Sequence, residues 1–118
     1  MTFVESLDRL KQTTKRYRAT TTRFQEDFDQ VHLVLMGIRH SLYYCLEHEN
    51  DMVISWDPRE DNKTYGLTFQ YYSDDSYAST TFDECPSDIK LIFHKYINKF
   101  LEEINDELNE SIKELETY

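Results

Sequence analysis

The sequence predicts an α+β fold with a long amino-terminal helix, a three-stranded antiparallel meander and a long carboxy-terminal helix packed on the sheet. Three observations lead to this prediction: a 3-4 spacing of apolar residues over residues 3–45, period-two alternation in the middle, and a second helical stripe at the end. A chain of 118 residues is long enough to bury one modest core. We therefore expect a single domain over residues 1–118.

The first segment is predicted to form one long helix that lies against another helix, because its apolar seam lasts for more than three heptads. Thr2 followed by Glu5 is a capping box, which places the helix start almost at the first residue. From Val31 onward apolar residues cover most of the circumference, so residues 1–30 should project and residues 31–118 should form the sheet-helix core. The seam comprises Phe3, Leu7, Leu10, Thr14, Tyr17, Thr21, Phe24, Phe28, Val31, Leu35, Ile38, Leu42 and Cys45.

The run of β-branched residues at 20–22 is the weak point of this helix, because such side chains lose rotamer freedom in a helical turn. A bend or hairpin at residues 19–22 is the alternative to a continuous helix. The projecting half needs another surface to cover it, and the predicted helix interface consists of Leu7, Leu10, Tyr17 and Phe24.

The middle of the chain alternates apolar and polar residues, as strands do. Met52, Ile54 and Trp56 mark the first strand, residues 65–71 the second and residues 77–82 the third. Polar turns at residues 57–62 and 73–76 join them. Connections this short favour an antiparallel meander.

A last helix is predicted to begin near residue 87, with Ser87 as its cap and Asp88 complementing the positive helix end. Ile89 to Leu101 should cover the sheet and residues 102–115 should extend past it. This order of elements is similar to that of coiled-coil adaptors that end in a small RWD-type head. The similarity is architectural and assigns no role to any residue.

Charge is unevenly distributed along the chain. The net charge is −10, yet residues 1–24 carry six basic and two acidic groups, which makes that stretch basic and the remainder strongly acidic. Successive residues of a helix turn by 100°, which places six carboxylates on one face of the last helix. We call these the acidic stripe: Glu102, Glu103, Asp106, Glu107, Glu110 and Glu114. Further carboxylates flank the predicted turns: Asp57, Glu60, Asp61, Asp74, Asp75, Asp83 and Glu84.

The acidic stripe has three interpretations. It is a solvated face that keeps the protein soluble, or it meets Arg9, Arg16 and Arg23 across a dimer, or it binds a basic external partner. In the third interpretation the stripe and the turn carboxylates resemble a nucleic-acid backbone in charge and occupy a nucleic-acid channel. The chain itself is not expected to bind nucleic acid, because it is strongly acidic and its basic residues are spread around the first helix.

No catalytic, cofactor or metal signature is present in the sequence. Two glycines, Gly37 and Gly66, exclude a phosphate-binding loop, and the four histidines lack the spacing of helical metal ligands. Cys45 and Cys85 are expected to be reduced and packed, and Glu84 and Asp88 oppose a thiolate at Cys85. We therefore expect no enzymatic activity, no cofactor and no bound metal.

The sequence thus favours a non-enzymatic acidic interaction module that binds a protein partner with a basic surface. Its most concrete form is a small inhibitor or nucleic-acid-mimicking decoy, of the kind that viruses or mobile elements use against host defences. The alternative is an adaptor that forms a homodimer through the first helix. A cytoplasmic location is expected, because no apolar run reaches membrane-spanning length and residues 1–10 include Glu5 and Asp8.

Overall fold

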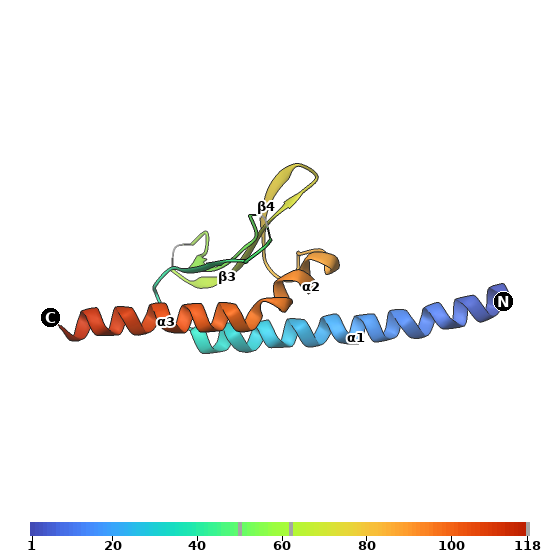
Figure 1. Ribbon diagram of the computed structural model, residues 1–118, viewed down its shortest axis with the longest axis horizontal. Coiled ribbons are helices and arrows are strands. Elements are labelled where there is room, and N and C mark those ends of the chain that lie inside the picture. Colours follow the sequence, from blue (N-terminus) through green and yellow to red (C-terminus); the bar gives the residue numbers. More distant parts are fainter. Residues whose placement is uncertain (50, 62, 118) are drawn as a thin grey trace.

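The computed structural model describes residues 1–49, 51–61 and 63–117, and it confirms the α+β class. Within these ranges the sheet has four strands, one more than predicted. A sheet and a short helix sit on one side of a long helical rod (Figure 1), and the molecule measures 72 × 31 × 29 Å. The elements are α1 (Phe3–Leu35), β1 (Leu42–Cys45), β2 (Val53–Pro58), β3 (Tyr65–Ser73), β4 (Ser76–Thr80), α2 (Ser87–Lys95) and α3 (Ile97–Glu116).

Helix α1 is continuous through residues 19–22, so the alternative bend does not occur. The threonine hydroxyls bond back to the helix: Thr20 Oγ1 donates to the Arg16 carbonyl at 2.9 Å and Thr21 Oγ1 to the Arg18 carbonyl at 3.0 Å. These bonds satisfy the polar groups of a stretch that has low helix propensity. At the start of the helix, Thr2 Oγ1 accepts from the Glu5 amide at 3.2 Å, as the capping box predicts.

The predicted helical seam to Cys45 is wrong in its last quarter, because α1 ends at Leu35. Gly37 follows with a φ of 89°, a left-handed conformation that favours glycine and stops the helix. Residues 42–45 then form β1 with an alternating burial pattern. The Trp56 indole donates to the Ile38 carbonyl at 2.9 Å, which ties the connecting loop to the sheet.

All strand pairs are antiparallel, in the order β1-β2-β3-β4. The inner face of the sheet presents buried side chains such as Ile54, Trp56 and Phe69 to the helices, and Phe28 of α1 packs edge-on against Phe69 with ring centroids 5.1 Å apart. Hydrophobic burial on this face holds the head together.

Polar turns occur between the predicted strands, but Asp57 and Pro58 belong to β2 and not to the first turn, and the last strand ends at Thr80 and not at residue 82. Asn62, the last residue of the first predicted turn, lies outside the described residues.

The predicted single carboxy-terminal helix is divided at Tyr96 into α2 and α3. Ser87 is the first helical residue and not the cap; Pro86 occupies the cap position without a side-chain hydrogen bond, and Asp88 lies in the first turn as predicted. The break lets α2 pack on α1 while α3 takes a new direction along β1. His94 of α2 contacts Asp27 of α1, with Nε2 and Oδ2 2.7 Å apart.

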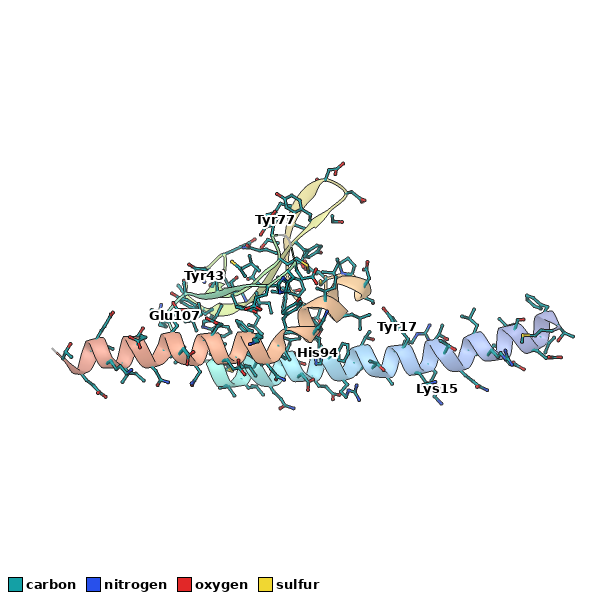
Figure 2. The ribbon with its side chains drawn as sticks, viewed as in Figure 1. Lys15, Tyr17, Tyr43, Tyr77, His94 and Glu107 are labelled. Carbon is teal, nitrogen blue, oxygen red and sulfur yellow. The ribbon has the colours of Figure 1, made fainter. Side chains whose placement is uncertain are left out.

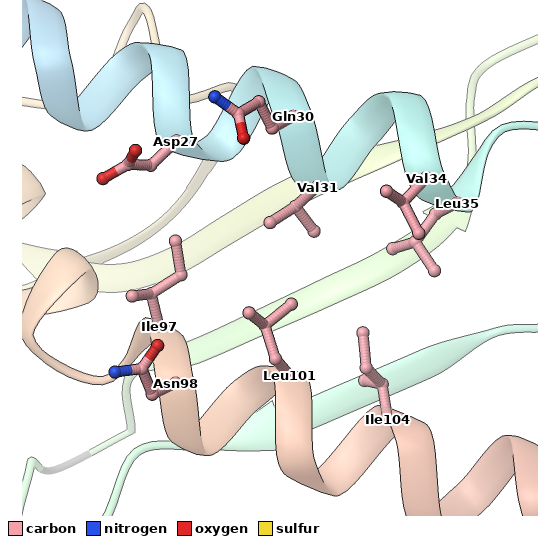
Figure 3. A pocket seen from close by; sticks show the side chains of 9 residues that line it. All are labelled: Asp27, Gln30, Val31, Val34, Leu35, Ile97, Asn98, Leu101 and Ile104. Carbon is pink, nitrogen blue, oxygen red and sulfur yellow. The ribbon is translucent and has the colours of Figure 1, made fainter.

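Helices α1 and α3 run in the same direction and overlap only near the middle of the rod (Figures 1 and 3). Residues from 27–35 of α1 and 97–104 of α3 line a common groove, which sets the overlap at about two helical turns. The amino end of α1 therefore projects from one end of the rod and the carboxyl end of α3 from the other (Figure 1). None of the described helices combines the length and apolar character that a membrane crossing requires.

Candidate interaction surfaces

The first surface is the projecting half of α1, defined here as residues 3–23, which contains no buried residue. Of the predicted helix interface, Leu7, Leu10 and Tyr17 are exposed, with Leu10 retaining 57% of its surface in contact with solvent. Phe24 is different, because it is partly buried and stacks on His94 with ring centroids 3.7 Å apart. Figure 2 shows Tyr17 on the open stretch beyond α2.

The exposed seam and the core-facing stripe of α1 are one surface. At 100° per residue, Phe3, Leu10 and Tyr17 lie within about 20° of the direction of Phe28. Phe28 is 1% exposed, whereas Phe3 is 79% exposed. The same helix face is thus covered by the head in its carboxy-terminal third and left without cover in its first two thirds.

The second surface is the acidic stripe on α3. Glu102, Glu103, Asp106, Glu110 and Glu114 are exposed and Glu107 is partly buried. The described contacts include Lys113 Nζ to Glu110 Oε1 at 3.5 Å, Lys99 Nζ to Glu102 Oε2 at 4.0 Å and His40 Nε2 to Glu107 Oε1 at 3.7 Å. Exposed pairs at such distances contribute little to stability. Within the described residues, no ion pair joins this stripe to the arginines of α1.

The turn carboxylates do not join the acidic stripe in a single surface. Asp57, Glu60 and Asp61 lie at or near the β2–β3 turn, and Asp74 and Asp75 form the β3–β4 turn. The nine residues of β3 separate these turns, a distance of about 26 Å at the rise of a strand. The predicted acidic set is therefore divided among separate regions, with the β3–β4 turn at the tip of the hairpin that stands farthest from the rod (Figure 1).

Three of these turn carboxylates have structural roles. Asp74 and Asp75 have φ values of 49° and 63°, which a two-residue hairpin turn of this type requires and which aspartate tolerates better than most residues. Asp61 accepts hydrogen bonds from the Lys63 and Thr64 amides at 3.0 and 3.1 Å. These bonds lower the pKa of Asp61, because they stabilise the charged carboxylate. Turn geometry accounts for these acids without a ligand.

Sequence reasoning missed the groove between α1 and α3, a space of about 520 Å³ (Figure 3). Its walls are mostly apolar, and Val34 at its rim is 81% exposed. The broadened apolar surface after Val31 was a signal for this groove, but the break at Tyr96 that aligns α3 with α1 was not evident in the sequence. The lining residues are Asp27, Gln30, Val31, Val34, Leu35, Ile97, Asn98, Leu101 and Ile104.

The outer face of the sheet was also missed. Tyr43, Tyr72 and Tyr77 are exposed there, and the Tyr77 hydroxyl donates to Gln70 Oε1 at 3.2 Å. Figure 2 shows Tyr43 and Tyr77 on the head, away from the rod. The alternation of strand residues assigns them to the face opposite the core, but the fourth strand was needed to define that face.

The cysteines differ in environment. Cys45 is exposed, which corrects the prediction that it is packed, because it lies on the outward-facing side of β1. Cys85 is buried, and burial raises the pKa of its thiol to about 11, which opposes formation of a nucleophilic thiolate. Over residues 1–49, 51–61 and 63–117, no three His, Cys, Asp or Glu side chains are grouped to hold a metal ion.

Comparison of the chain with protein-family models, curated proteins and solved structures finds no significant match. The surfaces described above are therefore the basis for a functional proposal.

Proposed function

We propose that this chain is a non-enzymatic protein-interaction module in which the projecting half of α1 pairs with a helix of a partner, as in a coiled-coil adaptor. The observation that carries this proposal is the exposed apolar seam on a helix that extends far beyond its own core. Phe3, Leu7, Leu10 and Tyr17 recur at helix-pairing intervals and are all exposed. A partner helix would remove these side chains from water.

The physical reason for preferring the seam is the difference between apolar and charged surfaces. Water solvates a carboxylate well, so the acidic stripe needs no cover. Burying a leucine or phenylalanine side chain contributes about 1.5–3 kcal/mol relative to leaving it exposed. The seam therefore offers binding free energy that the single chain leaves unused.

Alteration of the seam, with a matched control at exposed positions away from it, tests this proposal. Leu7→Glu with Leu10→Glu should abolish association through α1, while Gln12→Glu with Thr22→Glu, at exposed positions off the seam, should leave it intact. Both variants should keep the circular dichroism spectrum and unfolding midpoint of the native head. Equal self-association and equal partner recovery by the native chain and the seam variant would refute the proposal.

A second candidate is the acidic inhibitor or nucleic-acid-mimicking decoy, of the virus-encoded or mobile-element type, with a protein partner that has a basic surface. Its support is the acidic stripe itself, since Glu103, Asp106 and Glu114 have no ion-pair partner among the described residues. Binding of this kind weakens steeply as salt rises.

The decoy has its own test. The native chain and the variant Glu103→Lys, Asp106→Lys, Glu110→Lys are compared for inhibition of nucleic-acid enzymes over a range of salt concentrations. Inhibition that is absent, or that is insensitive to both salt and charge reversal, excludes the decoy. We propose the cytoplasm as the compartment for either function, in keeping with the free thiols at Cys45 and Cys85.

A further inference from the structure

We propose that the outer face of the sheet binds a basic segment of a partner protein, and that the exposed tyrosines of this face hold arginine side chains of that segment. The surface lies on the head, apart from the seam of α1, so this binding does not depend on pairing through the seam. Three features of the outer face support it: exposed aromatic rings, carboxylates beside them, and strand positions without basic residues.

Strand register brings the outward-facing side chains into rows. Tyr72 of β3 is directly opposite Tyr77 of β4, and their ring centroids are 5.0 Å apart with planes inclined by 58°. Tyr72 is 54% exposed and Tyr77 is 48% exposed, so a ligand can reach both rings. Tyr43 of β1 is opposite Ser55 of β2, which is in turn opposite Thr68 of β3. The outer face therefore carries two aromatic positions, a tyrosine pair and a single tyrosine.

The separation of these two positions sets the spacing of the cations that would reach them. The rows of Tyr43 and Tyr72 are four residues of β3 apart, from Thr68 to Tyr72, which is about 13 Å at the rise of a strand. Two strand spacings, about 10 Å, separate β1 from β3 across the sheet. An extended segment covers the combined distance of about 16 Å in five residues. Two arginines five residues apart would therefore reach both positions.

Carboxylates surround the tyrosine pair. Asp51 is level with Tyr72 when the β2–β3 register is continued by two residues beyond the paired part of β2. Burial raises the pKa of the Tyr77 hydroxyl, and the nearby charge of Asp51 raises it further. Asp74 and Asp75, in the turn between β3 and β4, add two more carboxylates. The described ion pairs include none of these three acids, so this end of the face attracts cations.

Basic groups of the chain itself are kept away from the tyrosine pair. In the described part of the chain, no outward-facing strand position is occupied by lysine or arginine. Arg59 reaches the sheet at Gly66, six residues of β3 from Tyr72, or about 20 Å. A cationic ligand at the tyrosine pair would therefore meet attraction without competition from a basic side chain of the head.

A guanidinium group suits this environment. Its flat cation is attracted to the face of an aromatic ring and can also donate hydrogen bonds to a carboxylate. The cation–π contacts found among the described residues are on Phe24, Phe82 and Tyr96, so they leave the tyrosines of the outer face available to a partner. Nucleic acid is a poor ligand for this face, because its phosphates would meet the carboxylates.

Fluorescence anisotropy with two labelled peptides tests the proposal on the full chain. The first peptide consists of serine and threonine with two arginines five residues apart, and the second has glutamine in place of each arginine. The arginine peptide should bind at least about tenfold more tightly than the glutamine peptide. Raised salt should weaken its binding. Equal binding of the two peptides overturns the proposal.

Variants of the chain locate the binding site. Tyr72→Ala with Tyr77→Ala should weaken binding of the arginine peptide at least about fivefold, whereas Tyr72→Phe, which keeps the ring, should stay within about twofold of the native chain. Tyr17→Ala removes a similarly exposed tyrosine from α1 and should leave the binding unchanged. Native circular dichroism spectra for all three variants show that the head is folded.

Neutralisation of one carboxylate tests the charge without loss of the turn. Asparagine tolerates the φ of 57° that Asp51 adopts, so Asp51→Asn should fold as the native chain does. It should weaken binding of the arginine peptide about threefold and reduce the dependence on salt. Asp8→Asn makes the same charge change on α1 and should leave the binding unchanged. Native affinity of Asp51→Asn at every salt concentration would contradict the proposal.

Protection of Cys45 measures occupancy of the face without a substitution in the site. Cys45 is exposed and is level with Val53 and Gln70, in the row next to the tyrosine pair. Saturating arginine peptide should slow the reaction of Cys45 with a thiol reagent severalfold, and the glutamine peptide should not. Protection that instead grows with the concentration of the chain alone would mean that a second copy covers this face, which would overturn the proposal.

Two further outcomes would assign the basic segment or the face differently. Loss of peptide binding in Glu103→Lys, Asp106→Lys, Glu110→Lys, with the tyrosine variants unaffected, would place the peptide on the acidic stripe and overturn the proposal. Tighter binding of a single-stranded oligonucleotide than of the arginine peptide, through the same tyrosines, would also overturn it. Neither outcome concerns pairing through the seam, which Leu7→Glu with Leu10→Glu tests separately.

Discussion

A pair of leucines on one face of α1 provides the sharpest test of whether this helix has a packed carboxy-terminal part and an unpacked projecting half. Leu10 is 57% exposed and Leu35 is 3% exposed, although both belong to the same seam. Truncation of each to alanine removes the same atoms from the same type of secondary structure. The difference in their effects therefore reports only what surrounds each side chain.

The expected magnitudes are far apart. Leu35 packs in the core with Phe28 and Val31, so Leu35→Ala loses transfer free energy and leaves a cavity, at a cost of about 3–5 kcal/mol in the free energy of unfolding. Leu10 is exposed and lies outside the core, and alanine is the better helix former, so Leu10→Ala should change the free energy of unfolding by less than about 0.5 kcal/mol.

Urea unfolding followed by circular dichroism measures both values at low micromolar concentration, where association through α1 is weak, and again at high micromolar concentration, where it is strongest. Leu10→Ala should become destabilising only in the second series, because partner binding adds to apparent stability by mass action. A loss above about 1 kcal/mol for Leu10→Ala in the dilute series would refute the reasoning, since it would mean that the projecting half is packed within a single chain.

Three further predictions concern the head. In the native protein at pH 8, a thiol reagent should modify Cys45 rapidly and Cys85 only after unfolding, as counted by absorbance with Cys45→Ser as control. The Cys85 thiol has a pKa of 9.0 in the unfolded chain and about 11 in the folded protein, so between these pH values the unfolded chain loses the proton first. The free energy of unfolding should therefore fall as pH rises from about 9 to about 11. Cys85→Ala should remove this contribution to the pH dependence of the free energy of unfolding. Asp75→Gly should raise the free energy of unfolding by about 1 kcal/mol, because glycine adopts the φ of 63° without strain, whereas Gly37→Ala should lower it by about 1–2 kcal/mol at a φ of 89°.

The parts of the fold that follow local rules could be predicted from the sequence. The capping box at Thr2 and the alternation in β2 and β3 are short-range patterns, and both occur as expected. The helix end was misplaced because Leu35, Ile38, Leu42 and Cys45 continue a 3-4 spacing by coincidence, and the alternation at 42–45 is only four residues long. Gly37 was the available signal.

The break at Tyr96 could not be predicted, because tertiary packing determines it. Tyr96 has ordinary helix propensity, yet its φ of −103° and ψ of 10° interrupt the helix. On one side of the break His94 reaches Asp27 and Phe24, and on the other side Phe100 and Ile104 enter the core. A straight helix could not make both sets of contacts.

Some of the candidate surfaces could be predicted from local sequence patterns and others could not. Periodicity predicted the exposed seam and the acidic stripe, since each lies on a single helix. The groove between α1 and α3 and the separation of the turn carboxylates depend on the relative placement of elements, which no local pattern encodes. The projection of α1 and α3 from opposite ends of the rod (Figure 1) likewise depends on how the elements are placed relative to one another.

The free energies of apolar burial and of charge interaction differ in size, and this difference is the reason for preferring pairing through the seam to the acidic decoy. Like-charge neighbours on the acidic stripe, such as Asp106 with Glu110, cost only a few tenths of a kcal/mol each when exposed. The seam residues Phe3, Leu7 and Leu10 offer several times as much on burial. Affinity should therefore come from the apolar seam, while the charges select the orientation and the partner. A decoy would have to obtain its affinity from the charges alone, so its binding should vanish in salt that leaves pairing through the seam largely intact.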